Sequence, residues 1–214
     1  MKVVNPSFIF QDDVNAQEIL EKIEKAGRTA YKSEHRINES SATDFIKMII
    51  KRRHFSVLEH HSVTVKVICD RGVSHEIVRH RIASYTQEST RFCNYAKGRF
   101  GSEISVIKPC FWDDRNESER RMYSIWYSTI EKIEKSYLAL IEAGATPQEA
   151  RSILPNSLKT EIVVTMNLRE WRHFFTLRTS KNAHPQMREI STALLSEFKK
   201  RIPIIFDDIS TEYG

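Results

Sequence analysis

A strict alternation of apolar and polar side chains over residues 62–68 constrains the fold of this chain more than any other feature. Valine occupies every second position from Val63 to Val67, and polar residues stand between the valines. A period of two predicts a strand with one buried face. Further strands are predicted over Lys2–Phe10 and Thr160–Asn167. Because these strands do not alternate regularly with helices, the order favours an α+β fold over a doubly wound parallel sheet.

Helical patterns fill most of the remaining chain, which we expect to form a single domain over residues 1–214. Helices are predicted after Asn15, from near Ser41, over Val73–Ser84, over Asn116–Gly144, from a capping box at Thr146, over Leu168–Thr179 and over Pro185–Arg201. The segment from Tyr85 to Tyr95 is polar and better suited to an extended chain. The apolar residues of 116–144 are spaced for burial.

Cysteine content and apolar run lengths limit the class of protein. Cys69, Cys93 and Cys110 are an odd number without a C-x-x-C pair, so we expect free thiols, no structural zinc and no metal site. No apolar stretch approaches the ~20 residues that a membrane span requires. The N-terminal residues lack the pattern of a secretory signal. We therefore expect a cytoplasmic protein without a membrane partner.

The net charge of +5 and the pI of about 9.1 favour an anionic partner. The sequence lacks G-x-G-x-x-G and G-x-x-x-x-G-K-[ST], so side chains must hold any bound nucleotide. A non-enzymatic, basic nucleic-acid-binding domain is the alternative from another class. It explains less, because basic residues are interspersed with acidic ones and no zinc-finger, RRM or KH signature occurs. We expect no nucleic-acid partner.

Three arginines and a histidine fall within residues 79–91. On a helix, Arg79, His80 and Arg81 would fan over more than half of the circumference. Either two of them are merely solvated, or the helix lies between two ligands or at a subunit contact. An extended chain after residue 84 would place Gln87, Ser89 and Arg91 on one side, as a cradle for a phosphate. A basic surface helix followed by a polar edge strand is the plainer interpretation.

The whole pattern resembles the R-H-R-x-x-S-x-N-E-x-S-x-R motif of the flavin-dependent thymidylate synthase family. The matching positions are Arg79, His80, Arg81, Ser84, Ser89 and Arg91. The family's Asn-Glu is Thr86-Gln87 here, and Glu88 follows one place later. Other segments are similar to family elements in the right order: Leu58-Glu59-His60, Ala150–Pro155, Asn167-Leu168-Arg169 with His173 and Arg178, and Ala183–Gln186.

The resemblance implies a central, mostly antiparallel sheet flanked by helices, in a homotetramer that holds FAD between subunits. It implies conversion of dUMP to dTMP, with 5,10-methylene-tetrahydrofolate as the carbon donor, NADPH as the reductant and no covalent enzyme nucleophile. Arg178 would polarise the pyrimidine carbonyl, and Ser89, Arg91 and Arg151 would hold the phosphate. Cys93 is interpreted as structural.

The resemblance also assigns residues to each ligand. The catalytic positions are Arg178, Ser89 and His60. The dUMP positions are Glu76, Arg79, Gln87, Glu88, Ser89, Arg91, Arg151 and Arg178. The FAD positions are His60, Arg79, His80, Arg81, Gln87, Asn167, Arg169, His173 and His184. His173 stands where asparagine is common in the family, and two extra residues precede His184. Trp171, Phe174 and Phe175 are expected in the core.

Overall fold

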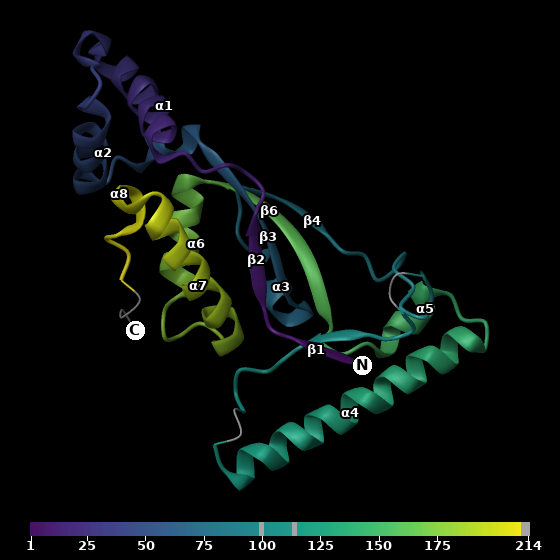
Figure 1. The fold of residues 1–214 in the computed structure, drawn as a ribbon. Helices are drawn as coiled ribbons and strands as arrows, with labels where there is room; N and C mark the ends of the chain where they lie inside the picture. The colour runs from purple at the N-terminus through teal and green to yellow at the C-terminus, as the bar shows by residue number, and fades with distance from the viewer. Residues whose placement is uncertain (99–100, 113–114, 211–214) are drawn as a thin grey trace. The chain divides into compact units, whose positions relative to one another are not determined.

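The computed structural model describes residues 1–98, 101–112 and 115–210 (Figure 1). Helices and strands are mixed and the sheet is antiparallel, which confirms the predicted α+β class. The chain divides into two compact units. The first unit comprises Met1–Ser7, Val67–Val78 and Thr86–Ile162, and the second comprises Phe8–Lys66, Arg79–Tyr85 and Val163–Gly214. The expectation of a single domain over residues 1–214 stays a prediction.

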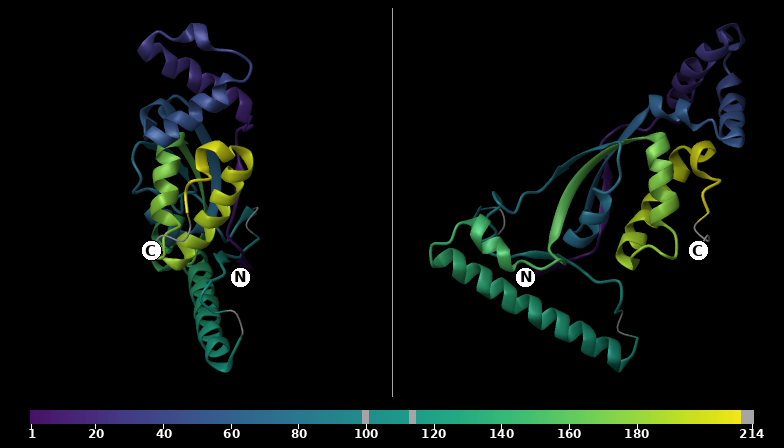
Figure 2. Two further views of the ribbon diagram at one scale, coloured as in Figure 1. Left: turned by 90° about the vertical axis from the view of Figure 1, so that its left-hand side faces the viewer. Right: turned by 180° about the vertical axis from the view of Figure 1, so that it is seen from behind.

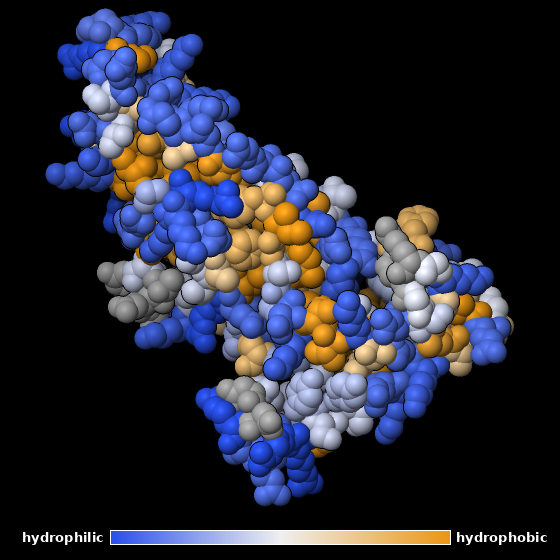
Figure 3. All heavy atoms as spheres, in the orientation of Figure 1, coloured by the Kyte–Doolittle hydropathy of each residue, from blue (hydrophilic) through white to orange (hydrophobic). Residues whose placement is uncertain are grey.

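The main sheet has four strands in the order β2-β3-β6-β4. Their bounds are β2 (Ser7–Phe10), β3 (Ser62–Asp70), β6 (Lys159–Asn167) and β4 (Ala83–Gln87). The predicted alternation in β3 is confirmed, because Val63, Val65 and Val67 are at most 3% exposed. The sheet therefore buries the valine face that the sequence pattern marks. Other apolar side chains are visible at the surface in the middle of Figure 3.

The prediction of one strand over Lys2–Phe10 is wrong. The segment forms β1 (Lys2–Val4), which pairs in parallel with β5 (Ser105–Ile107), and then β2 in the main sheet. Pro6 lies between the two strands. Because proline has no backbone N–H to donate, a strand is readily interrupted there.

The first unit contains α3 (Arg71–Ile77), α4 (Glu117–Glu142), α5 (Pro147–Ala150) and the 3-10 turn η5 (Arg151–Ile153). Asn116 caps α4 by accepting a hydrogen bond from the Glu119 amide, as an N-cap residue should. The expected burial of its apolar residues is confirmed in part, because Trp126, Ile133 and Ile141 are half-buried and pack against the core of the first unit. Among the described residues of α4, Ile130 and Tyr137 are buried, whereas Met122, Ile125 and Leu140 are 37–57% exposed.

The second unit contains the remaining helices. They are α1 (Ala16–Arg28), η1 (Thr29–Tyr31), η2 (Glu34–Arg36), α2 (Ser41–Arg52), η3 (Phe55–His60), α6 (Leu168–Arg178), α7 (Pro185–Arg201) and α8 (Pro203–Phe206). Helices α1 and α2 lie side by side, as do α6 and α7 (Figure 2). The rings of Trp171, Phe175, Phe198 and Phe206 are buried together. Trp171, Phe174 and Phe175 are thus core residues, as predicted.

The helix predicted over Val73–Ser84 is wrong over most of its length. Asp70 caps α3, which ends at Ile77, and residues 78–82 form a non-helical turn. In this turn the His80 ring contacts Glu170 and Arg178 of α6, and the His80 carbonyl accepts a hydrogen bond from the Tyr85 hydroxyl at 2.7 Å. These contacts override the local spacing of apolar residues. Residues 79–81 consequently do not fan around a helix.

The extended segment predicted from Tyr85 to Tyr95 is also wrong beyond β4, which ends at Gln87. The amides of Phe92 and Cys93 both donate to the Ser89 carbonyl, at 3.2 and 3.0 Å. The chain therefore turns at residues 89–93. The alternation that would place Gln87, Ser89 and Arg91 on one side of a strand does not exist here.

The three cysteines are free thiols, which confirms the prediction. Cys93 is half-buried and packs against the apolar core of the first unit. Within the described parts of the chain, no helix has both the length and the apolar character to cross a membrane.

Candidate active site

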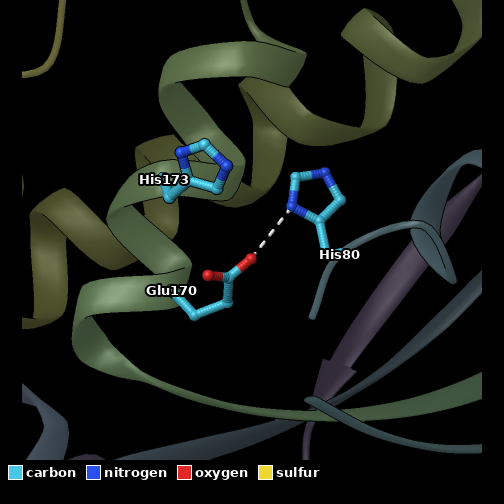
Figure 4. A group of neighbouring side chains, drawn as sticks. All are labelled: His80, Glu170 and His173. Atoms are coloured by element: carbon cyan, nitrogen blue, oxygen red, sulfur yellow. Dashed lines mark hydrogen bonds and ion pairs between the residues drawn. The ribbon is translucent and has the colours of Figure 1, made fainter. Parts of the chain in front are cut away.

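His80 is the centre of a hydrogen-bonded chain in the second unit. Its ring is buried, and only 5% of the residue is exposed. Its Nδ1 lies 3.1 Å from a carboxylate oxygen of Glu170 (Figure 4), and its Nε2 lies 2.9 Å from Nε of Arg178. A guanidinium is always protonated and can only donate, so Nε2 of His80 must be the acceptor. The proton of the neutral imidazole is therefore on Nδ1, where it donates to Glu170.

Titration properties agree with this arrangement. Burial, together with the neighbouring Arg178 and His173, lowers the pKa of His80 to about 4. Burial also raises the pKa of Glu170. At neutral pH the imidazole is uncharged and can accept the hydrogen bond from Arg178.

Ligating atoms of His80, Glu170 and His173 lie within 4.8 Å of one another, close enough to surround a metal ion (Figure 4). The hydrogen bond from Arg178 opposes that use. A metal at Nδ1 would force the imidazole proton onto Nε2, where it would face the N–H of Arg178 at 2.9 Å. A dication would also lie close to a guanidinium. The cluster is thus better suited to hydrogen bonding than to metal binding.

Two hollows adjoin this cluster within the second unit. The smaller, of about 370 Å³, is lined by Arg79, His80, Arg81, Glu170, His173, Leu177 and Arg178. The larger, of about 580 Å³, is lined by Phe55, Glu59, Ile82, Asn167, Arg169, Glu170, Arg172, His173 and Thr176. Glu170 and His173 line both hollows. The structure thus brings together seven of the sequence-predicted site residues: Arg79, His80, Arg81, Asn167, Arg169, His173 and Arg178.

The larger hollow has the mixed walls that a flavin nucleotide requires. Phe55 and Ile82 supply apolar surface for a planar ring, and Arg169 supplies positive charge for a phosphate. Arg172 adds an unsatisfied donor: its terminal nitrogens bind Asp208 at 2.6 and 2.7 Å, but its buried Nε has no hydrogen-bond partner among the described residues. A ligand acceptor would satisfy it. The residues present fit a flavin.

Asn167 has a second, structural role. Its side-chain oxygen accepts a hydrogen bond from the Glu170 amide at 2.9 Å and so caps α6. The residue that begins the helix is therefore also a wall of the larger hollow. Arg169 is exposed and donates to Glu59 at 2.6 Å.

The remaining predicted dUMP residues lie in the first unit. Gln87 is half-buried, and its amide nitrogen donates to the Ser74 and Thr160 hydroxyls at 2.8 and 3.2 Å. Ser74 donates its own proton to the Arg71 carbonyl, so it presents lone pairs to Gln87. An amide donor suits this position better than the family's carboxylate does.

Glu88 is engaged within the first unit. Its carboxylate accepts hydrogen bonds from the Tyr95 hydroxyl at 2.9 Å and from Nζ of Lys159 at 3.2 Å. Burial raises the pKa of Tyr95, and the neighbouring Glu88 charge raises it further. Tyr95 therefore stays protonated and remains a hydrogen-bond donor to Glu88.

The other predicted dUMP residues of the first unit are exposed or half-buried. Ser89 is half-buried, and its hydroxyl accepts from the Arg91 amide at 3.3 Å. Arg91 is exposed, with its guanidinium 5.4 Å from the centre of the Phe92 ring. Arg151 is exposed on η5, and Glu76 is half-buried on α3.

His60 and His184 are both exposed. His60 ends η3, His184 is the residue before α7, and neither belongs to the described lining of the two hollows. The flavin roles predicted for them stay predictions.

Sequence reasoning missed Glu59, Glu170 and Arg172 as site residues. Glu170 stands three places after the helix cap, where an acidic residue is usually explained by the helix terminus. Its partner His80 is 90 residues away in the sequence, so no local pattern links the two. Arg172 lies among the aromatic core residues of α6 and carries no motif signal.

A pocket walled by arginine and histidine side chains suits an anionic ligand such as a nucleotide. Residues 14–204 match the family model described as thymidylate synthase complementing protein. The chain belongs to the flavin-dependent thymidylate synthase family.

Three relatives named flavin-dependent thymidylate synthase illustrate the similarity. That of Pyrococcus furiosus is 35% identical over 176 residues, which cover 82% of this chain and 70% of the relative. That of Geobacter sulfurreducens is 35% identical over 81% of this chain and 72% of its own. That of Corynebacterium efficiens is 31% identical over 96% of this chain and 85% of its own.

Among solved structures, the chain resembles a UMP/dUMP methylase, PolB, from Streptomyces cacaoi, crystallised with 5-Br dUMP. The TM-score is 0.79, with 97% of this chain and 96% of the other covered. Sequence identity is 20%, so the likeness concerns the fold.

Proposed function

We propose that this chain is a thymidylate synthase that converts dUMP to dTMP with the help of a bound flavin. Family membership over residues 14–204 supports the reaction. The observation that carries the proposal is the contact between Arg178 and the buried, neutral His80 beside a hollow that fits a flavin. The proposed co-substrates are 5,10-methylene-tetrahydrofolate, as the carbon donor, and NADPH, as the reductant.

The flavin, as FAD, would occupy the hollows of the second unit. Arg79, Arg81 and Arg169 would bind its phosphates, and His80, Asn167 and His173 would bind polar atoms. Reduced flavin supplies a hydride, which no protein side chain can store.

The chain's own contribution is positioning and electrostatic stabilisation. Arg178 would donate to a carbonyl oxygen of the pyrimidine, which gains negative charge when C5 of the ring reacts with the one-carbon unit. The growing charge makes this hydrogen bond stronger in the transition state than in the ground state, and a guanidinium already held in place loses little freedom when it forms. Serine or cysteine nucleophiles are not required.

The nucleotide phosphate would bind in the first unit. Arg91 and Arg151 would supply positive charge and the Ser89 hydroxyl a neutral donor. Gln87 and Glu88 would hold this segment in place through the contacts described above, while Glu76 would lie near the base. The protein would form a homotetramer in which His60, Gln87 and His184 approach the flavin. Each subunit would form one domain, and the protein would be located in the cytoplasm.

Release of tritium from C5-labelled dUMP tests the proposal. With methylene-tetrahydrofolate, FAD and NADPH present, the wild-type protein should release tritium, and omission of any one should stop turnover. Arg178→Ala should lower kcat by about 100-fold, the size of effect seen when a donor to a developing oxyanion is removed. Lys135→Ala, which changes an exposed lysine on α4, serves as the control. A colourless protein that releases no tritium but binds oligonucleotides with a steep salt dependence would contradict the proposal.

A further inference from the structure

We infer that Glu170 is a positioning residue for Arg178 and that it acts through the imidazole of His80. The inference rests on the proposed function, because it assigns Arg178 to the pyrimidine. It adds a residue for which the sequence motifs give no role. Its basis is the unbroken series of contacts from the Glu170 carboxylate, through both nitrogens of His80, to Nε of Arg178.

The first step concerns what Glu170 does to His80. An ionised carboxylate can accept hydrogen bonds but cannot donate them. Glu170 therefore favours the imidazole with its proton on Nδ1, and that form leaves a lone pair on Nε2. The other contacts of His80 fix the ring in place: its carbonyl accepts from the Tyr85 hydroxyl, and its ring packs edge-on against Phe174 at a centroid distance of 4.9 Å.

The second step concerns what His80 does to Arg178. A bond at Nε fixes the plane of the guanidinium, and with it the direction of the two terminal amino groups. Arg178 is the last residue of α6, and its carbonyl accepts from the Ser191 hydroxyl at 2.7 Å. The backbone end of the side chain and its Nε are therefore both held, and fewer conformations of the arginine remain to be lost on binding.

Glu170 and Arg178 are too far apart on α6 for their side chains to contact each other. Glu170 and Arg178 are eight residues apart on one helix, about 12 Å along its axis. Side chains at that separation do not contact each other directly. His80 comes from the turn after α3 and contacts both. The described contacts thus link the carboxylate to the guanidinium by way of the imidazole, which makes the order of action testable.

A double-mutant cycle in the flavin-loaded enzyme tests the inference. Glu170→Ala should lower kcat for tritium release by about tenfold and leave the KM for dUMP within about twofold, because the contact matters most in the transition state. In an Arg178→Lys background, which lacks the Nε–H, the same change should have little further effect on kcat. Glu170→Met, of similar length and without an oxygen acceptor, replaces Glu170→Ala if the alanine variant does not fold. Glu197→Gln, which alters a carboxylate paired with Lys200 on α7, is the control.

A spectroscopic measurement separates positioning from a merely structural role. The Nε–H resonance of Arg178, identified by its loss in Arg178→Lys, should exchange slowly with water in the wild-type protein and rapidly in Glu170→Ala. Equal exchange rates, a kcat at the wild-type level, or a change confined to KM would overturn the inference. Equal loss of kcat in both backgrounds would do so too. If the wild-type protein releases no tritium, the proposed function fails, and the exchange measurement, which needs no substrate, still decides the role of Glu170.

Discussion

Replacement of His80 by glutamine should make the stability of the ligand-free protein less sensitive to acid. Glutamine can donate to Glu170 and accept from Arg178, as the neutral imidazole does, but it does not titrate. The histidine has its pKa lowered to about 4 in the fold by burial and by Arg178 and His173, and it returns to an ordinary value near 6.5 on unfolding. Between about pH 4 and pH 6.5, the unfolded chain therefore binds a proton at this residue and the folded chain does not.

The sign and size of the effect follow from this difference. Above about pH 6.5 the imidazole is neutral in both states and the free energy of unfolding does not depend on its protonation. As the pH falls from 6.5 toward 4, the unfolded chain alone binds the proton, so the folded protein loses stability. Between pH 7.5 and pH 5 the loss from this one residue is about 2 kcal/mol. His80 is 5% exposed, so solvent screening takes little from that figure. Glu170 faces the same ring, and its protonation in this range would reduce the loss.

Urea unfolding at several pH values measures the effect. Between pH 7.5 and pH 5 the wild-type midpoint should fall by about 1 M more than that of His80→Gln, for a slope of about 2 kcal/mol per M. Groups that do not contact residue 80 titrate alike in the two proteins, so the difference reports on His80 and its partner Glu170. Parallel losses of stability in the two proteins would refute the argument that the buried imidazole is neutral.

Three further substitutions test the fold. Asn116→Ala removes the cap of α4 and its bond from the Glu119 amide, so urea unfolding should show a loss of about 1 kcal/mol, and no loss would contradict the capping role. Gln87→Glu places a carboxylate against the lone pairs of Ser74, so urea unfolding should show a loss of about 1 kcal/mol in stability. An increase in stability would contradict the hydrogen bond from the Gln87 amide to Ser74. Phe198→Ala opens a cavity at a fully buried ring, and thermal unfolding should reveal a loss of about 3–5 kcal/mol; a loss below 1 kcal/mol would exclude it from the core.

Local rules predicted the parts of the fold that depend on neighbouring residues. The cap at Asn15 was predicted, because a side-chain oxygen there accepts from the amide three residues later. Asn116 and Asn167 make the same contact, and the helices that follow them begin close to the predicted positions. The valine alternation of β3 was equally reliable, since a period of two has one interpretation at that length. Elements whose ends are decided by such contacts could be located from the sequence alone.

Long-range contacts explain the failures. The segment from Val73 to Ser84 has helical spacing, yet the helix stops at Ile77 because His80 is drawn into contact with α6. The family motif identified His80 and Arg178 as site residues, and the structure places them in contact. Glu170 could not be found in the same way, because its significance depends on a partner 90 residues earlier in the chain.

Helix α6 has one face in the aromatic core and presents Glu170, His173 and Arg178 on another. A substitution at Phe175 that rolled the helix by a few degrees would displace all three together while touching no ligand. A screen that measures turnover alone would then identify the apolar residue Phe175 as essential for catalysis, although it contacts no ligand. The stability of each α6 variant should therefore be measured before its residue is assigned a role in the reaction.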